Sequence, residues 1–174
     1  MADTLTQFSG NNANRANTAF MIGFFTILGA WGFELIGGYE PCELCLGQRI
    51  PYYVGLPLLA VIIGGWTKFP QKLRIALTLV VAGIFLWSTY LGAFHAGVEW
   101  KFWPGPTACA GTGEGLDFSA LSSINDARVV PCDDPEFRFL GISFAGYNAL
   151  ISALIAAFLL WSALGQIKRM QQQA

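Results

Sequence analysis

The stretch GYEPCELCLGQRIPYYVG, residues 38–55, decides how the chain is interpreted, because it sets a Cys-x-x-Cys pair against an apolar run. The pair is Cys42 and Cys45, and the charge-free run that follows Arg49 extends from 50 to 67. Cys-x-x-Cys pairs are typical of soluble redox domains, whereas a charge-free run of this length is typical of a membrane span. Together the two signals predict a reactive dithiol at the start of a membrane-spanning helix.

Three further charge-free runs occur, at 16–33, 75–94 and 139–167. Crossing a hydrocarbon core of about 30 Å takes about 20 helical residues. Hydrophobic residues make up 54% of the chain and charged residues 12%, against about 25% charged in soluble domains. A soluble all-α protein would show polar faces that these runs lack. The sequence predicts one all-α membrane domain, 1–174, with two outer loops (the longer at about 96–141) and four transmembrane helices near 17–36, 50–66, 75–95 and 142–165.

The basic residues are divided unevenly between the two sides of this bundle. The side with both termini and the loop 67–74 carries six of the ten: Arg15, Lys68, Lys72, Arg74, Lys168 and Arg169. The other side carries Arg49, Lys101, Arg128 and Arg138. Because cytoplasmic segments are enriched in lysine and arginine, we expect both termini in the cytoplasm. The first span lacks a convincing small-residue cleavage site, so we expect it to be retained.

All four cysteines, Cys42, Cys45, Cys109 and Cys132, fall on the outer side of this topology, where disulfides form and persist. Two structural disulfides would suit the long loop, but a bridge between cysteines three residues apart constrains little chain. A four-cysteine zinc site usually uses two tight pairs, and here one pair is tight. Thiol–disulfide exchange, for which Cys-x-x-Cys is the usual active pair, is favoured, and we expect no metal. Spacing alone leaves the three alternatives open.

The residues around the Cys-x-x-Cys pair favour a thiolate. Pro41 suits the first turn of a helix, so we expect the second helix to begin at about Cys42. The unpaired N–H groups and the positive dipole end of that turn stabilise a thiolate, although Glu43 acts against one at Cys42. Arg49 lies four residues after Cys45, on the same helix face. Its charge either holds an anion beside that sulfur or anchors the helix at the headgroups.

The sequence resembles the disulfide bond formation protein B (DsbB) family of bacterial inner membranes, from the first span to the fourth. The motifs that carry the resemblance are PCELCLGQR at 41–49, His95 at the outer end of the third span, WPGPTAC ending in Cys109, and PCDDPEFRFLG at 131–141. The stretch HAGVEWKFWPGP, 95–106, is similar to the alphaproteobacterial branch. Gly47 and Gln48 depart from the best-known members, which carry a bulkier segment before the arginine.

This resemblance implies a protein-dithiol:quinone oxidoreductase that reoxidises a periplasmic thioredoxin-like protein, DsbA, and uses ubiquinone or menaquinone. DsbA-type proteins are strong oxidants, near about −120 mV, so thiol pools near about −220 mV cannot reoxidise them. The electrons need an acceptor of higher potential. A quinone dissolved in the bilayer is such an acceptor, which explains a Cys-x-x-Cys pair at the membrane. We expect a monomer that binds membrane lipid and no nucleic acid.

The resemblance also implies a role for each cysteine. Cys109 would form the mixed disulfide with the partner, and Cys132 would be its loop mate. Cys42 would exchange with Cys132 and so link the two outer loops. Cys45 would be the thiolate that faces the quinone.

Two further residues would bind the quinone by the same resemblance. Arg49 would lie beside Cys45, and His95 would lie near the quinone ring. A lone histidine beside a span end is equally common as a polar residue satisfied at the interface. Glu34 either marks the outer end of the first span or serves a proton path to reduced quinone.

Two other functions compete with this interpretation. A vitamin K epoxide reductase-like oxidase shares the bundle, the quinone and four cysteines, but usually carries its Cys-x-x-Cys pair near the last span. A non-catalytic membrane protein with two structural disulfides would stay oxidised in quinone-depleted membranes, whereas an oxidase would accumulate free thiols.

Overall fold

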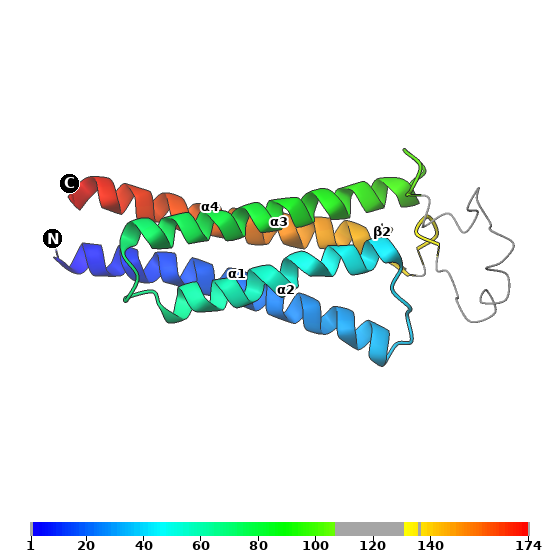
Figure 1. The fold of residues 1–174 in the computed structure, drawn as a ribbon, viewed down its shortest axis with the longest axis horizontal. Coiled ribbons are helices and arrows are strands. Elements are labelled where there is room, and N and C mark those ends of the chain that lie inside the picture. The colour runs from blue at the N-terminus through cyan, green and yellow to red at the C-terminus, as the bar shows by residue number, and fades with distance from the viewer. Residues whose placement is uncertain (1, 107–130, 136, 174) are drawn as a thin grey trace, which may run out of the picture.

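The computed structural model describes residues 2–106, 131–135 and 137–173, which form an antiparallel bundle of long helices (Figure 1). An antiparallel hairpin of two short strands leads directly into the last helix. In chain order the elements are α1 (Ala2–Leu35), α2 (Glu43–Gly64), α3 (Gln71–Glu99), β1 (Arg138–Phe139), β2 (Ile142–Ser143) and α4 (Phe144–Gln173). Both ends of the chain lie at one end of the bundle, and the hairpin and the start of α2 lie at the other (Figure 1).

All four helices are long and apolar enough to cross a membrane, which confirms the predicted four-span bundle. α1 and α3 begin earlier than the predicted spans, because polar and charged residues before each charge-free run are also helical. α2 begins at Glu43, one residue after the start expected from Pro41. The apolar segments are Gly10–Leu35, Glu43–Gly64, Gln71–Glu99 and Phe144–Gln172.

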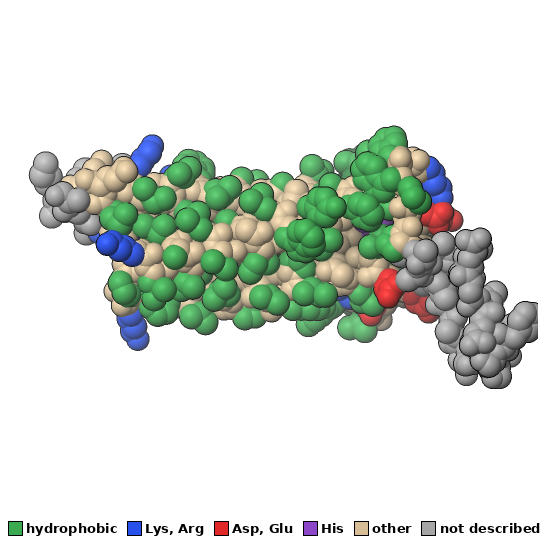
Figure 2. Space-filling model, turned by 45° about the horizontal axis from the view of Figure 1, so that its top comes forward, with side chains coloured by type: hydrophobic (Ala, Val, Ile, Leu, Met, Phe, Trp, Pro, Cys, Tyr) green, Lys and Arg blue, Asp and Glu red, His purple; other side chains and the backbone are tan. Residues whose placement is uncertain are grey.

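The surface of the bundle is apolar and its interior contains polar groups. Large apolar side chains such as Phe25, Trp87 and Leu150 are exposed, and hydrophobic side chains cover the middle of the face in Figure 2. Lys and Arg side chains gather at the end where the termini lie (Figure 2). This distribution is the one expected in lipid, where intramembrane polar side chains face the bundle interior. The buried polar residues of the described part include Gln48, Ser88, His95, Glu99 and Ser152.

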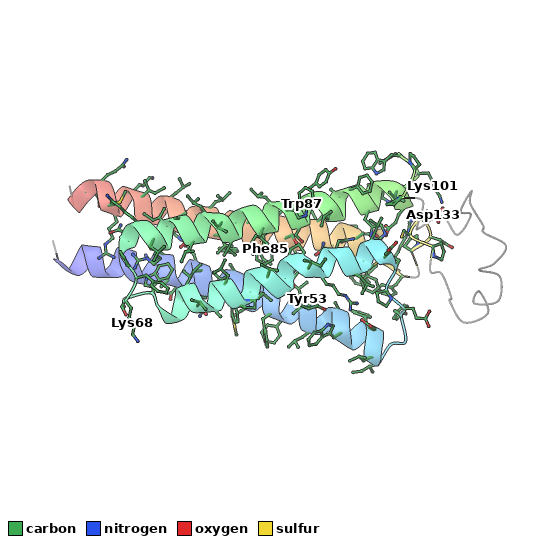
Figure 3. All side chains as sticks on the ribbon, in the orientation of Figure 1. Tyr53, Lys68, Phe85, Trp87, Lys101 and Asp133 are labelled. Carbon is green, nitrogen blue, oxygen red and sulfur yellow. The ribbon has the colours of Figure 1, made fainter. Side chains whose placement is uncertain are left out.

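Small residues let α3 and α4 approach closely near the cysteine end of the bundle. A Cβ atom added at Gly92 of α3 would lie 2.7 Å from the backbone nitrogen of Ala149 and 2.9 Å from the carbonyl oxygen of Ala145, both in α4. The two backbones are therefore in contact, as is common at small residues in membrane bundles. Two turns earlier in α3, Phe85 is fully buried (Figure 3) and packs edge-on against Tyr52, with ring centroids 5.3 Å apart. The close α3–α4 contact fixes the position of His95, one turn further along α3.

The hairpin between β1 and β2 aligns the chain for entry into α4. Arg138 pairs with Ser143 and Phe139 with Ile142, so the two residues between them, Leu140 and Gly141, form the turn. Both turn residues have positive φ, 49° and 80°, as a two-residue hairpin loop of type I′ requires.

We expect Gly92→Ala to destabilise the protein by about 1–3 kcal/mol, because the new methyl group meets backbone atoms that cannot move aside. Gly83→Ala is the matched control, since its Cβ would have nothing within 4 Å. The measurement is thermal unfolding of both variants in the same detergent, followed by circular dichroism. Equal stability of the two variants would contradict the backbone contact.

Candidate redox site

The Cys-x-x-Cys pair lies at the first turn of α2. Cys42 is the N-cap of the helix, with extended backbone angles, and the backbone N–H of Cys45 donates to its sulfur at 3.3 Å. Pro41 precedes the cap, so the expectation that it occupies the first helical turn was wrong. Pro41 nonetheless limits the helix, because a proline disfavours helical backbone angles at the residue before it, here Glu40.

The two sulfur atoms form a close pair of free thiols. They lie 2.7 Å apart and are hydrogen-bonded. The possible ligand atoms of Cys42, Cys45 and His95 all lie within 4.8 Å of one another. Two thiolates on one tetrahedral zinc ion, with Zn–S bonds of about 2.3 Å, would be roughly 3.8 Å apart. The observed spacing is about 1 Å shorter than such a zinc site needs.

Cys132 lies against this pair from the other cysteine-bearing segment. It is disulfide-bonded, fully buried, and forms a small buried cluster with Cys42. The two segments are 90 residues apart in the sequence (132 minus 42), and the fold brings them into contact. Cys109 lies outside the described residues, so its predicted role stays a prediction.

His95 of α3 joins the two cysteine segments. Its Nε2 atom lies 3.8 Å from the sulfur of Cys42 and 3.1 Å from the carbonyl oxygen of Cys132. The same nitrogen lies 3.7 Å from a carboxylate oxygen of Glu99. The ring is buried. These contacts place His95 between the two cysteine segments, and its predicted place near the quinone ring stays a prediction.

The environment of Cys42 favours its thiolate. A hydrogen bond with Cys45 lowers the pKa of the Cys42 thiol to about 5; burial opposes the shift, and a hydrogen bond with His95 adds to it. With this pKa the Cys42 thiol is ionised at neutral pH, and the thiolate is the form that attacks disulfides. The family resemblance implied a thiolate at Cys45; the lowered pKa favours a thiolate at Cys42 in the dithiol, and the role of Cys45 at the quinone stays a prediction.

Arg49 of α2 forms an ion pair with Glu34 of α1. The ion pair gives Glu34 a partner on α2. Both residues line the same cavity as the two cysteines of the Cys-x-x-Cys pair. Arg49 is mostly buried, with 13% of its side chain exposed, and its role at the quinone or at the headgroups stays a prediction.

A chain of buried hydrogen bonds continues from His95 into the bundle. Its members are polar residues on three different helices, so no local pattern connects them. The bonds run between His95 and Gln48 (2.7 Å), Gln48 and Asn148 (2.7 Å), Asn148 and Tyr52 (2.8 Å), Tyr52 and Ser152 (2.9 Å), and Ser152 and Ser88 (2.9 Å). Sequence analysis missed Tyr52 and Asn148; the available signal was polar residues inside apolar spans.

A cavity of about 510 Å³ opens beside the dithiol. Cys42, Cys45 and Arg49 line its polar part. Elsewhere it is walled by aromatic rings, among them Phe33 and Phe144, which meet edge-to-face with centroids 4.8 Å apart. A mostly apolar cavity of this size with a few convergent polar groups is typical of a site for a small organic molecule.

A four-span bundle with a buried free dithiol, a second cysteine against it and an apolar cavity beside it defines a membrane oxidoreductase that acts on thiols. The family model described as "Disulfide bond formation protein DsbB" matches residues 14–162, and the chain belongs to this family. It is therefore a multi-pass inner-membrane protein of a family that works with DsbA and is linked to quinone electron transport.

One relative comes from Rickettsia prowazekii (strain Madrid E) and is described as "Uncharacterized protein RP370". It is 29% identical over 132 residues, which cover 72% of this chain and 73% of the relative. Rickettsia is an alphaproteobacterium, in agreement with the predicted branch. No solved structure matches the chain.

We expect the thiolate of Cys42 to be lost as the pH falls through about 5. Removing the hydrogen bond from its neighbour with Cys45→Ala should raise the pKa of Cys42, because that bond is the largest cause of the shift. The measurement is thiolate ultraviolet absorbance against pH. Gly47→Ala, on the same turn with nothing within 4 Å of its Cβ, is the control. An unchanged Cys42 titration in Cys45→Ala would contradict the assignment.

Proposed function

We propose that this protein is an inner-membrane disulfide oxidase that reoxidises a periplasmic DsbA-type protein and passes the electrons through two cysteine pairs to membrane quinone. The observation that carries the proposal is the position of the Cys42–Cys45 dithiol. It lies against the disulfide-bonded Cys132, and all three cysteines line the apolar cavity. A purely structural disulfide protein has no use for a free, ionised dithiol in that position.

The first half of the proposed path is thiol–disulfide exchange. The partner's dithiol reduces the Cys109–Cys132 disulfide through a mixed disulfide at Cys109, which yields oxidised partner and two thiols. The thiolate of Cys132 then attacks Cys42 in a Cys42–Cys45 disulfide, and Cys45 leaves as a thiolate. Attack by Cys109 on Cys132 restores the loop disulfide and leaves Cys42 and Cys45 reduced. Free thiols beside a disulfide-bonded Cys132 correspond to this last stage.

The second half returns Cys42 and Cys45 to a disulfide, with loss of two electrons and two protons. A bound ubiquinone or menaquinone supplies a two-electron, two-proton acceptor. The cavity residues fit such a ring: Phe33 and Phe144 present aromatic faces, and Arg49 presents a charged donor to a carbonyl group. Cys42 and Cys45 would then form the S–S bond, and the two electrons and two protons that they lose would go to the quinone.

We further propose a single membrane domain that acts as a monomer, with both termini in the cytoplasm and the cysteines in the periplasm. Six of the ten basic residues belong to the segments near the termini and the 67–74 turn, and cytoplasmic segments are enriched in such residues. Lys68 lies at that end, and Lys101 and Asp133 lie at the cysteine end (Figure 3).

Purified protein in lipid nanodiscs should reduce added quinone when, and only when, a reduced DsbA-type protein is supplied. Cys42→Ser and Cys45→Ser should each abolish quinone reduction, because each removes half of the dithiol that is oxidised. Gly83→Ala, far from the site and facing outward, should retain it. The readout is the change in quinone absorbance. Folded wild-type protein that leaves the quinone oxidised would overturn the proposed function.

Arg49→Ala should lower kcat/KM for quinone by about 10- to 100-fold, the size of one lost charge-assisted hydrogen bond, with near-normal dependence on the partner. Arg49→Lys should be milder, since it keeps the charge and loses the planar fork of donors. Glu34→Gln is the matched control, because it removes the ion pair and leaves the guanidinium at the cavity. If Glu34→Gln and Arg49→Ala lower kcat/KM for quinone equally, the effect comes from loss of the ion pair between α1 and α2. A contact of the guanidinium with the quinone would then be contradicted.

A further inference from the structure

The hydrogen bonds around His95 determine which ring nitrogen carries the hydrogen. Nε2 lies 3.1 Å from the carbonyl oxygen of Cys132, and a carbonyl oxygen only accepts, so Nε2 is the donor. In a neutral imidazole the other nitrogen is then an acceptor. Nδ1 lies 2.7 Å from Nε2 of Gln48, whose amide therefore donates to it.

The amide of Gln48 is held in this orientation by two further side chains. Its oxygen accepts from the amide nitrogen of Asn148 at 2.7 Å. The oxygen of Asn148 in turn accepts from the hydroxyl of Tyr52 at 2.8 Å. All four bonds therefore run in one direction, from Tyr52 to the carbonyl of Cys132. Turning the Gln48 amide alone would bring its nitrogen against the nitrogen of Asn148 and leave both without an acceptor.

The chain is built from three helices and lies in the interior. Tyr52 follows Gln48 by four residues, so both lie on one face of α2, while Asn148 comes from α4 and His95 from α3. Gln48, Tyr52 and His95 are almost completely buried. Without water to replace a lost partner, each of these bonds is costly to break or reverse.

We propose that Gln48, Asn148 and Tyr52 are positioning residues that hold His95 as the neutral tautomer with its hydrogen on Nε2, aimed at the two cysteine segments. That N–H is shared between the carbonyl of Cys132 and the sulfur of Cys42, 3.8 Å away. It therefore stabilises the Cys42 thiolate while it holds Cys132 in reach. Only this use in exchange rests on the proposed function; the tautomer itself does not.

The charged and titratable groups around this centre make such a device necessary. Cys45 faces Cys42 from α2, Glu99 faces His95 from the next turn of α3, and Arg138 of β1 acts on Glu99. One oxygen of Glu99 lies 3.7 Å from Nε2, and the other is buried with no hydrogen-bond partner in the described part of the chain. A carboxylate at that place attracts a second proton to the ring. The N–H of Gln48 facing Nδ1 opposes it.

The sequence offers a direct test, because His95 is the single histidine of the chain. Protein labelled with ¹⁵N-histidine, and purified with a tag free of histidine, gives the ring signals of this residue alone. We expect one pyridine-type nitrogen, assigned to Nδ1 by its couplings to the ring protons, and one pyrrole-type nitrogen, Nε2, at neutral pH. A pyrrole-type Nδ1 in the wild-type protein, with or without a protonated Nε2, would overturn the proposal.

Substitutions then separate positioning from packing. Gln48→Leu removes the donor to Nδ1, and we expect mixed tautomers and a pKa of Cys42 raised by about one unit, the size of one weakened hydrogen bond to the thiolate. Gln48→Glu offers only an acceptor, and we expect both ring nitrogens to become pyrrole-type. Tyr52→Phe should loosen the tautomer to a smaller extent than Gln48→Leu.

Ser88→Ala is the matched control. Ser88 belongs to the same buried network through Ser152 but lies beyond Tyr52, where it does not orient the amides. We expect it to leave the ¹⁵N spectrum unchanged. A wild-type spectrum in Gln48→Glu would overturn the role of Gln48, and if the Gln48 variants fail to fold, the wild-type spectrum still decides the tautomer. An inactive wild-type enzyme with the expected spectrum would refute the proposed function and leave this inference intact.

Discussion

The hydrogen bond from the imidazole of His95 to the backbone carbonyl of Cys132 is the contact on which the arrangement of the reactive centre depends. It ties α3 to the segment that carries the second cysteine pair and thereby brings Cys132 against Cys42. The bond is buried, so it is electrostatically stronger than it would be in water, and losing it would leave two polar groups unpaired. The contact between the two cysteine segments is made at this junction, and from there His95 adds to the lowered pKa of Cys42.

The lipid surroundings explain why the junction needs support from so far away. A polar side chain inside a membrane bundle has no water to turn to, so its partners must come from other helices. His95 is one end of a hydrogen-bonded chain that reaches Tyr52 and Ser88 near the middle of the bundle. Such a network is rigid because every member already has its partners. The close α3–α4 contact at Gly92 keeps the helices at the spacing that these bonds require.

The position of the dithiol at the end of the bundle follows from what its family does. Members of the DsbB family link thiol chemistry outside the hydrocarbon core to electron transport by lipid-soluble quinone. A helix N-terminus at the membrane boundary serves both needs, because it stabilises a thiolate and adjoins an apolar cavity. The ion pair of Arg49 with Glu34 joins α2 to α1 at this end of the bundle.

The sequence by itself determined the four spans and the place of the Cys-x-x-Cys pair, because both are local: a charge-free run must be long enough to cross the bilayer, and a helix start is set by the residues around it. The error at Pro41 is small for the same reason: Pro41 lies two residues before Glu43, the first residue of α2. Tertiary structure alone decided the contact of Cys42 with Cys132, the pairing of Arg49 with Glu34 and the bond between Gln48 and Asn148, 100 residues apart. In the sequence Gln48 was only a departure from a motif; its meaning arises from side chains on two other helices, which no spacing along one helix encodes.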